Sequence, residues 1–380
     1  MNDSIKLGRV AGFPLAMNWS VLVVASLLTW SLATTSLPHH AMGHAALTYW
    51  LAGFATAVVF FGSLLVHELA HALVARRHGV QVKGLTLWLF GGMATLGGEP
   101  PSPRADFRIA AAGPAASLGL AAVFELTAVG LHRFGVGHLM VVAAAWLAGI
   151  NLMLGVFNLL PGAPLDGGRV LRAFLWRRHG DRLRATVTAA KAGAVVAFLL
   201  IGLGVLEFFW GVSMSGFWLV FVGWFLLTAS RAEGADALLQ GALLGVAVAE
   251  VMSAPPVIVS GSMSVAEFID SDALGRHSAY PVVGPDGQVI GMITLAQVRQ
   301  IRRSDRSSTS LADVALPLSA VPIASPDDSL AGVAERLSTD EGGRALVFDQ
   351  GGLAGILTMG DVLRSAELCR ARGAGHHLVG

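Results

Sequence analysis

The sequence of 380 residues contains little charge and a single cysteine. Asp, Glu, Lys and Arg make up 13% of it, which is about half the fraction found in ordinary globular proteins. Together with a net charge of +1, this deficit excludes a disordered chain and a nucleic-acid-binding protein that depends on a strongly basic surface. The one cysteine, Cys369, excludes an intramolecular disulfide framework and a zinc site built from several thiolates.

The charged residues that are present are unevenly distributed. Residues 1–230 contain only 23 of the 51, although they form the longer part of the chain. Between Val10 and Ala75 the one charged residue is Glu68. Because hydrophobic residues make up 54% of the sequence, these features indicate a membrane domain followed by a water-soluble domain.

A membrane-spanning helix needs about 20 consecutive apolar residues. Six segments meet or approach this requirement: residues 17–36, 47–75, 109–131, 139–160, 186–209 and 217–230. If the N-terminus is inside, fourteen Lys and Arg residues flank the spans on the cytoplasmic side and only Arg133 lies outside, as the positive-inside rule requires. We therefore predict a polytopic α-helical protein of the cell membrane, with about six transmembrane helices and both the N-terminus and the C-terminal domain in the cytoplasm.

The C-terminal domain contains an internal repeat. Residues 280–294 match residues 345–358, and each copy is typical of two apolar strands around a Gly-containing turn, followed by the start of a helix. The predicted domain boundaries are a membrane domain at 1–230, a linker helix at 231–250, repeats at 251–301 and 311–367, a polar linker at 302–310 and a tail at 368–380.

Glu68 belongs to an H-E-x-x-H motif with His67 and His71, inside an otherwise apolar helix. Residues four apart lie about 40° apart around a helix and about 6 Å along it, so both imidazoles face one metal ion. An ionisable residue in a membrane is costly enough to indicate a function. The alternative is that His67 and His71 are hydrogen-bonded packing residues and that Glu68 pairs with one of them.

A catalytic zinc site takes three protein ligands and keeps one position for water. The fourth predicted span runs inward, as the second does, and ends where Pro161, Gly162 and Pro164 interrupt the helix at membrane depth. Asp166 is the one acid in this turn, and we predict that it is the third zinc ligand. The alternative is that Asp166 caps the following cytoplasmic helix. With zinc held in this way, Glu68 is the predicted general base.

These motifs resemble the site-2 protease family of intramembrane zinc metalloproteases, and within it the bacterial and archaeal subgroup that carries C-terminal tandem CBS domains. Besides H-E-x-x-H, the resemblance rests on Asn158-x-x-Pro and Leu165-Asp-Gly after the fourth span, on Ala112-Gly-Pro-Ala in the third, and on the two α/β repeats. It implies regulated hydrolysis of peptide bonds within or near the transmembrane helix of a single-pass substrate, for example an anti-sigma factor. It also implies that Asn158 holds the substrate backbone or the developing oxyanion, the alternative being a helix–helix hydrogen bond.

The CBS resemblance implies a ligand and a partner. CBS pairs typically hold adenosyl ligands, and the ribose-binding Thr-x-x-Asp pattern matches Thr358 and Asp361 in the second copy, whereas the first copy has Gln297 at the corresponding position. One adenine-nucleotide site and a homodimer through the CBS domains are therefore expected. The alternative is a module that only dimerises.

Asn18 stands where many relatives have histidine, so no role is assigned to it.

A short β-hairpin is predicted directly after the second span, at residues 85–96 around Gly91-Gly92. One edge of it is expected to pair with the extended substrate, the alternative being a re-entrant loop that plugs the cavity.

Two alternative functions belong to other classes: a CBS-gated ion transporter, and an inactive relative that acts as a membrane receptor. Neither explains the intact ligand set. Glu125 in the third span fits no motif, and the outer-loop histidines His39, His40 and His44 could bind a metal but lack a nearby carboxylate.

Overall fold

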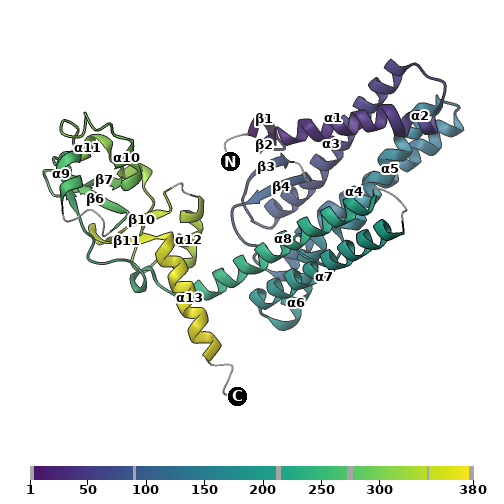
Figure 1. The fold of residues 1–380 in the computed structure, drawn as a ribbon. Helices are drawn as coiled ribbons and strands as arrows, with labels where there is room; N and C mark the ends of the chain where they lie inside the picture. The colour runs from purple at the N-terminus through teal and green to yellow at the C-terminus, as the bar shows by residue number, and fades with distance from the viewer. Residues whose placement is uncertain (1–3, 89–90, 211–214, 272–276, 340–341, 376–380) are drawn as a thin grey trace. The chain divides into compact units, whose positions relative to one another are not determined.

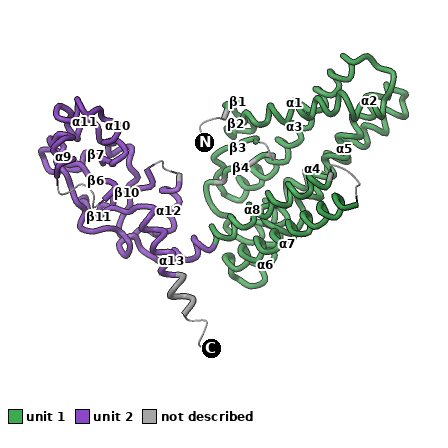
Figure 2. Tube along the Cα trace, viewed as in Figure 1, with its two compact units in different colours: residues 1–237 green, residues 238–380 purple. Residues whose placement is uncertain are grey.

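The computed structural model describes residues 4–88, 91–210, 215–271, 277–339 and 342–375. The chain divides into two compact units, Met1–Ala237 and Leu238–Gly380 (Figures 1 and 2). The first unit contains a helical bundle with one small sheet, and the second contains two small sheets with short helices.

Helices dominate the first unit, because a helix satisfies its own backbone hydrogen bonds, as a membrane environment requires. Their bounds are α1 Ser20–Ser31, η1 Leu32–Ser36, α2 Leu37–His40, α3 Ala46–Arg77, α4 Pro103–Arg133, α5 His138–Asn158, α6 Asp166–His179, α7 Arg182–Phe209 and α8 Ser215–Leu243.

Five helical segments of the described chain are long and apolar enough to cross a membrane: Ser20–His40, Ala46–Arg77, Pro103–Arg133, His138–Asn158 and Arg182–Phe209. They overlap the first five predicted spans. The sixth predicted span, residues 217–230, lies within α8, which is not one of the five. A total of six spans therefore stays a prediction.

A four-stranded sheet follows the order β1-β2-β3-β4, with β1 Ser4–Val10, β2 Phe13–Asn18, β3 Val82–Trp88 and β4 Gly91–Leu96. Strands β2 and β3 are parallel, and the other pairs are antiparallel. The strands β1 and β2 were not expected from the sequence. The expected turn at Gly91-Gly92 is wrong, because these residues begin β4 and pair with Trp88 and Leu87. Residues 89 and 90, between the strands, lie outside the described chain.

Close packing around α4 depends on small residues, as is usual between membrane helices. Gly155 of α5 packs so closely on α4 that an added Cβ would meet the side chain of Leu118 and the carbonyl oxygen of Pro114. The face of α4 that is buried includes Asp106, Ile109, Gly113 and Ser117. The spacing of three or four residues places them along one side of the helix.

The segment between α5 and α6 is held from several sides. The N–H of Ala163 donates to the carbonyl of Ala189 in α7 at 3.1 Å, and the hydroxyl of Ser230 in α8 donates to the carbonyl of Ala163 at 2.5 Å. A Cβ on Gly168 would collide with the backbone of Gly162 and Ala163. This segment therefore leads into α6 along a path fixed by three helices.

In the second unit, each repeated segment forms an antiparallel strand pair followed by a helix. The first copy has β6 Ala279–Val283, β7 Val289–Thr294 and α10 Leu295–Gln300, and the second has β10 Arg344–Asp349, β11 Gly352–Thr358 and α13 Met359–Gly375. The other elements are η2 Val248–Glu250, β5 Val259–Ser260, α9 Val265–Asp270, α11 Leu311–Val314, β8 Leu316–Pro317, η3 Leu318–Ala320, β9 Ile323–Ala324 and α12 Leu330–Thr339. One apolar core lies within the first copy, and a second joins the second copy to Leu243 and Val248.

Candidate functional site

Helix α3 carries three residues of the H-E-x-x-H motif. His67 and His71 lie one turn apart, and both side chains are buried, with 4% and 5% of their surface exposed. Their rings meet edge to face at 4.9 Å between centroids. The helical spacing predicted from the sequence therefore brings both imidazoles to the same side of α3.

Asp166 completes a compact triangle with the two histidines. Its Oδ2 lies 3.2 Å from Nε2 of His67 and 3.1 Å from Nε2 of His71, and the two Nε2 atoms are 3.2 Å apart. Asp166 is the first residue of α6, and Leu165 holds the cap position with an extended backbone. The Asp166 side chain thus faces the histidines, as the ligand hypothesis expects.

The hydrogen bonds of the histidines determine which ring nitrogens are free. Nδ1 of His71 lies 2.6 Å from the carbonyl oxygen of Ile109, and because a carbonyl can only accept, Nδ1 carries the hydrogen. In the neutral ring Nε2 then presents a lone pair. Nδ1 of His67 lies 2.9 Å from Oγ of the fully buried Ser117, and a hydroxyl that accepts from this Nδ1 leaves Nε2 with its lone pair. Such partners commonly orient metal-binding histidines.

The donor set fits a zinc ion. Zinc in a tetrahedral site with bonds of about 2.0 Å separates neighbouring ligand atoms by about 3.3 Å, close to the sides of the triangle formed by His67, His71 and Asp166. Two imidazole lone pairs and a carboxylate oxygen at this separation repel one another unless a proton or a metal ion lies between them. These three residues form a group whose ligand atoms lie within 4.8 Å of one another.

Two glycines leave room for the motif. A Cβ on Gly113 of α4 would overlap Nε2 of both His67 and His71. A Cβ on Gly92 of β4 would overlap the Glu68 side chain, so this strand passes directly against the carboxylate-bearing residue. Glu68 therefore follows His67 on α3 and lies against β4 at Gly92.

The other residues singled out in the membrane domain are dispersed. Asn158 ends α5, and its amide donates to the carbonyl of Leu154 at 3.0 Å within its own helix. Oδ1 of Asn18 accepts from the backbone N–H of Ser20 at 3.0 Å at the start of α1. Glu125 is exposed on α4. The outer-loop histidines His39, His40 and His44 do not belong to any metal-binding group of three within the described ranges.

Ser117 and the carbonyl of Ile109 were missed by the sequence reasoning. A single serine in a span rich in Ala and Gly gives no local signal of its partner. A search for polar residues on the α4 face that includes the Gly113-Pro114 pair would have found Ser117, which lies one turn after Gly113. Its contact with His67 could not be inferred without the packing of α4 on α3.

In the second unit, Thr358 and Asp361 form a capping box at the start of α13. The Thr358 hydroxyl donates to Oδ2 of Asp361 at 2.7 Å, and the Asp361 N–H donates back to Oγ1 at 3.2 Å. Thr294 and Gln297 form the same arrangement in the first copy, at 2.8 and 3.3 Å. The Thr-x-x-Asp pattern thus has a local structural role, which neither requires nor excludes a ligand.

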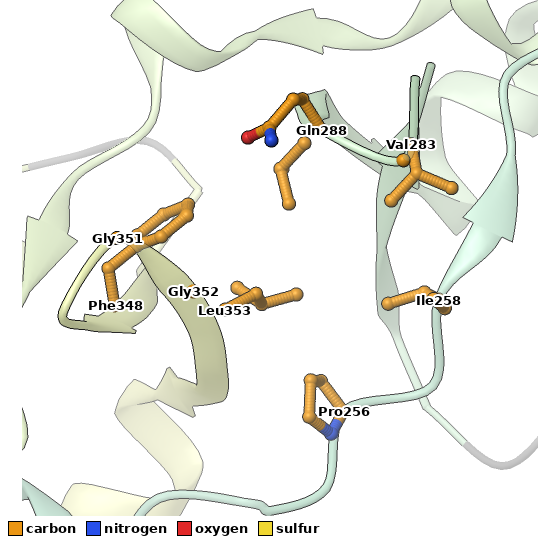
Figure 3. Close-up of a pocket in the computed structure, with 10 residues that line it drawn as sticks. Pro256, Ile258, Val283, Gln288, Phe348, Gly351, Gly352 and Leu353 are labelled. Atoms are coloured by element: carbon orange, nitrogen blue, oxygen red, sulfur yellow. The ribbon is translucent and has the colours of Figure 1, made fainter. Parts of the chain in front are cut away.

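A cavity of about 310 Å³ lies elsewhere in this unit, between the strand pairs of the two copies (Figure 3). Ile258 and Val283 of the first copy and Phe348 and Leu353 of the second line it. Thr358 and Asp361 are not among the lining residues. The cavity and the expected ribose-binding residues are therefore two different places.

Comparison with known proteins gives consistent matches. The model of peptidase family M50 matches residues 55–137 and 132–202, and the CBS domain model matches residues 248–303 and 311–367. A Mycobacterium tuberculosis protein named zinc metalloprotease Rip3 is 50% identical over 372 residues, which are 97% of this chain and 94% of the relative. Zinc metalloprotease MJ0392 of Methanocaldococcus jannaschii is 27% identical over 369 residues, 97% of either chain. The solved Site-2 Protease from Methanocaldococcus jannaschii is 28% identical and covers 61% of this chain and 95% of that chain, with a TM-score of 0.43.

Proposed function

The chain belongs to peptidase family M50 and is a metallopeptidase with tandem CBS domains, and we propose that it hydrolyses peptide bonds within or near the transmembrane helices of membrane-anchored substrates. The observation that carries this proposal is that Asp166 of α6 converges with His67 and His71 beside Glu68, and that the last three lie on α3, a helix long and apolar enough to cross a membrane. Because the chain belongs to a peptidase family, the alternative of a CBS-gated ion transporter is no longer needed.

The mechanism assigns each residue one task. His67, His71 and Asp166 would hold zinc, which when bound would polarise the scissile carbonyl and acidify the attacking water. The Glu68 carboxylate accepts the proton of that water and then delivers it to the leaving amine. Asn158 is proposed to hold the substrate backbone or the developing oxyanion. Its hydrogen bond to Leu154 must then be exchanged for one to the substrate.

The proposed setting is the cell membrane, with the N-terminus and the CBS domains in the cytoplasm, because basic residues concentrate in the loops on that side. The substrate class is a single-pass membrane protein, for example a membrane-anchored anti-sigma factor. A homodimer through the CBS domains is the proposed assembly.

Co-expression of the full-length chain with candidate single-pass membrane proteins tests this function. We expect a shortened substrate fragment that disappears when Asp166 is replaced by alanine, because zinc then loses its third ligand. Removing zinc from the purified parent with a chelator and restoring it is expected to abolish and restore cleavage. A fragment that persists both in Asp166→Ala and after chelation would overturn the proposed function.

We place the proposed substrate pairing on β4. Strand β3 already pairs with β2 on one side and β4 on the other, so its residues Thr86 and Leu87 are interior and present no free edge. Strand β4 is the terminal strand of the sheet, and it passes against Glu68 at Gly92. An extended substrate paired with β4 would bring its peptide bonds beside the proposed general base.

Proline substitutions at Met93 and Ala94, made one at a time, test the pairing. Neighbouring residues of an antiparallel strand direct their N–H groups to opposite sides, so one proline removes a bond to β3 and the other removes a donor from the free edge. The variant whose proline removes the donor at the free edge is expected to fold and bind zinc. It is expected to cleave about 10-fold more slowly, which is the effect of losing one or two hydrogen bonds. Parental cleavage rates in both folded, zinc-loaded variants would contradict the pairing.

Adenine-nucleotide binding by the CBS module is proposed on the resemblance of Thr358 and Asp361 to the ribose-binding pattern. The hydrogen bond from the Thr358 hydroxyl holds the Asp361 carboxylate at the start of α13. Equilibrium binding of AMP to the full-length chain, with Asp361→Ala as the comparison, decides this part of the proposal. Equal binding by both chains would contradict the assigned residue.

A further inference from the structure

A buried ion pair joins the first turn of α4 to the middle of α6. Asp106 has no exposed surface, and Arg172 donates to both of its oxygens, from Nε at 2.9 Å and from Nη2 at 2.8 Å. Arg169 contributes a second cation, with Nη2 at 3.7 Å from Oδ1 of Asp106. A bidentate contact of this kind fixes the orientation of the two groups as well as their distance.

The same face of α4 contacts the proposed metal ligands on α3. Ser117 bonds to Nδ1 of His67, and the carbonyl of Ile109 accepts from Nδ1 of His71. The third ligand, Asp166, belongs to α6 and not to α3. Arg172, on that same helix, is bound to Asp106 of α4. One face of α4 is therefore linked to the helices that carry all three ligands.

We propose that Asp106 and Arg172 are positioning residues that hold α6 at the depth and rotation which place Oδ2 of Asp166 against His67 and His71. This inference rests on the proposed zinc-dependent function. Arg172 lies six residues after Asp166, about 9 Å along the helix, so a shift at the ion pair moves the whole first turn of α6. A functional ligand set tolerates displacements of only about 0.5 Å.

The geometry distinguishes this role from simple stabilisation by charge. Arginine provides two parallel donors in a rigid plane, whereas lysine provides one mobile point charge. If Arg172 sets the rotation of α6, Arg172→Lys must weaken zinc binding even though the positive charge is retained. If the pair only stabilises the fold, zinc binding must be unchanged in every variant that folds.

Zinc affinity of the purified full-length chain, measured by competition with a chromogenic chelator, tests the proposal. Arg172→Gln is expected to bind zinc about 10- to 100-fold more weakly, as when a group that orients a metal ligand is lost, and Arg172→Lys is expected to fall between it and the parent. The cobalt-substituted forms are expected to differ in absorption spectrum, because the carboxylate ligand shifts. Arg184→Gln is the matched control, since Arg184 forms an exposed ion pair with Asp181 at 3.1 Å near the same end of the bundle. It is expected to match the parent.

Removing one partner of a buried ion pair leaves the other charge unpaired and can prevent folding. The double variant Asp106→Leu with Arg172→Met avoids this by replacing the pair with apolar side chains. It is expected to fold, as judged by its thermal unfolding, and still to bind zinc at least about 10-fold more weakly. Parental zinc affinity and cobalt spectrum in this folded double variant would overturn the positioning role alone. Absence of zinc binding by the parent would overturn the proposed function instead.

Discussion

Replacement of Glu68 by glutamine is expected to abolish peptide hydrolysis while leaving zinc bound. Glutamine preserves the shape of the side chain beside Gly92 but cannot accept the proton of the attacking water. General acid–base catalysis contributes about 10²- to 10⁴-fold to rates, so cleavage should fall by at least this factor. Zinc content should match the parent, because the converging ligand atoms belong to His67, His71 and Asp166. Fragment formation and zinc stoichiometry, measured on the same preparation, check both statements.

Another acid of the candidate spans, Glu125, provides a matched control. Glu125 lies in α4, within a segment apolar enough to cross a membrane, but its side chain is exposed and lies outside the metal-binding group. Glu125→Gln removes one intramembrane carboxylate, as Glu68→Gln does, and is expected to retain parental cleavage. If Glu68→Gln keeps more than about a tenth of the parental rate, a general base worth at least about 10²-fold is excluded at this position.

The candidate ligands were predictable from the sequence because their signals are local. His67 and His71 are placed by helical periodicity alone, and Asp166 follows a helix break that Pro161 and Pro164 make unavoidable. Their hydrogen-bonding partners were not predictable. Ser117 is 50 residues from His67 in sequence. Its role depends on the packing of α4 against α3, which no local pattern encodes.

The fold shows the same division between local and long-range information. The first five spans could be predicted because the hydropathy of a segment depends only on its own residues. The N-terminal strands β1 and β2 could not be predicted, since β2 pairs in parallel with β3 across more than sixty intervening residues, most of them helical. Gly91 and Gly92 were assigned to a turn because glycine usually indicates one. At Gly92, however, the requirement for glycine comes from the Glu68 side chain that packs against it.

Substitution of Gly113 by alanine is expected to destroy the zinc site with a single methyl group. The added Cβ would overlap Nε2 of His67 and of His71, the two atoms that face Asp166. The rings cannot retreat without breaking their bonds to Ser117 and to the carbonyl of Ile109. Overpacking of this kind displaces side chains from their native rotamers. Zinc affinity should therefore fall by about 100-fold or more, which is at least the largest usual loss when a group that orients a metal ligand is removed. Cleavage should fall with it.

Gly119→Ala on the same helix isolates the steric cause. A Cβ at Gly119 meets nothing within 4 Å, and alanine is a better helix former than glycine, so this variant should bind zinc like the parent and unfold at the same or a slightly higher temperature. Chelator competition on both purified variants separates the two outcomes. Because Gly113→Ala adds the same methyl group and the same helix propensity, a difference between the variants can only come from what that methyl group meets. Parental zinc affinity in Gly113→Ala would show that His67 and His71 do not bind the metal through Nε2.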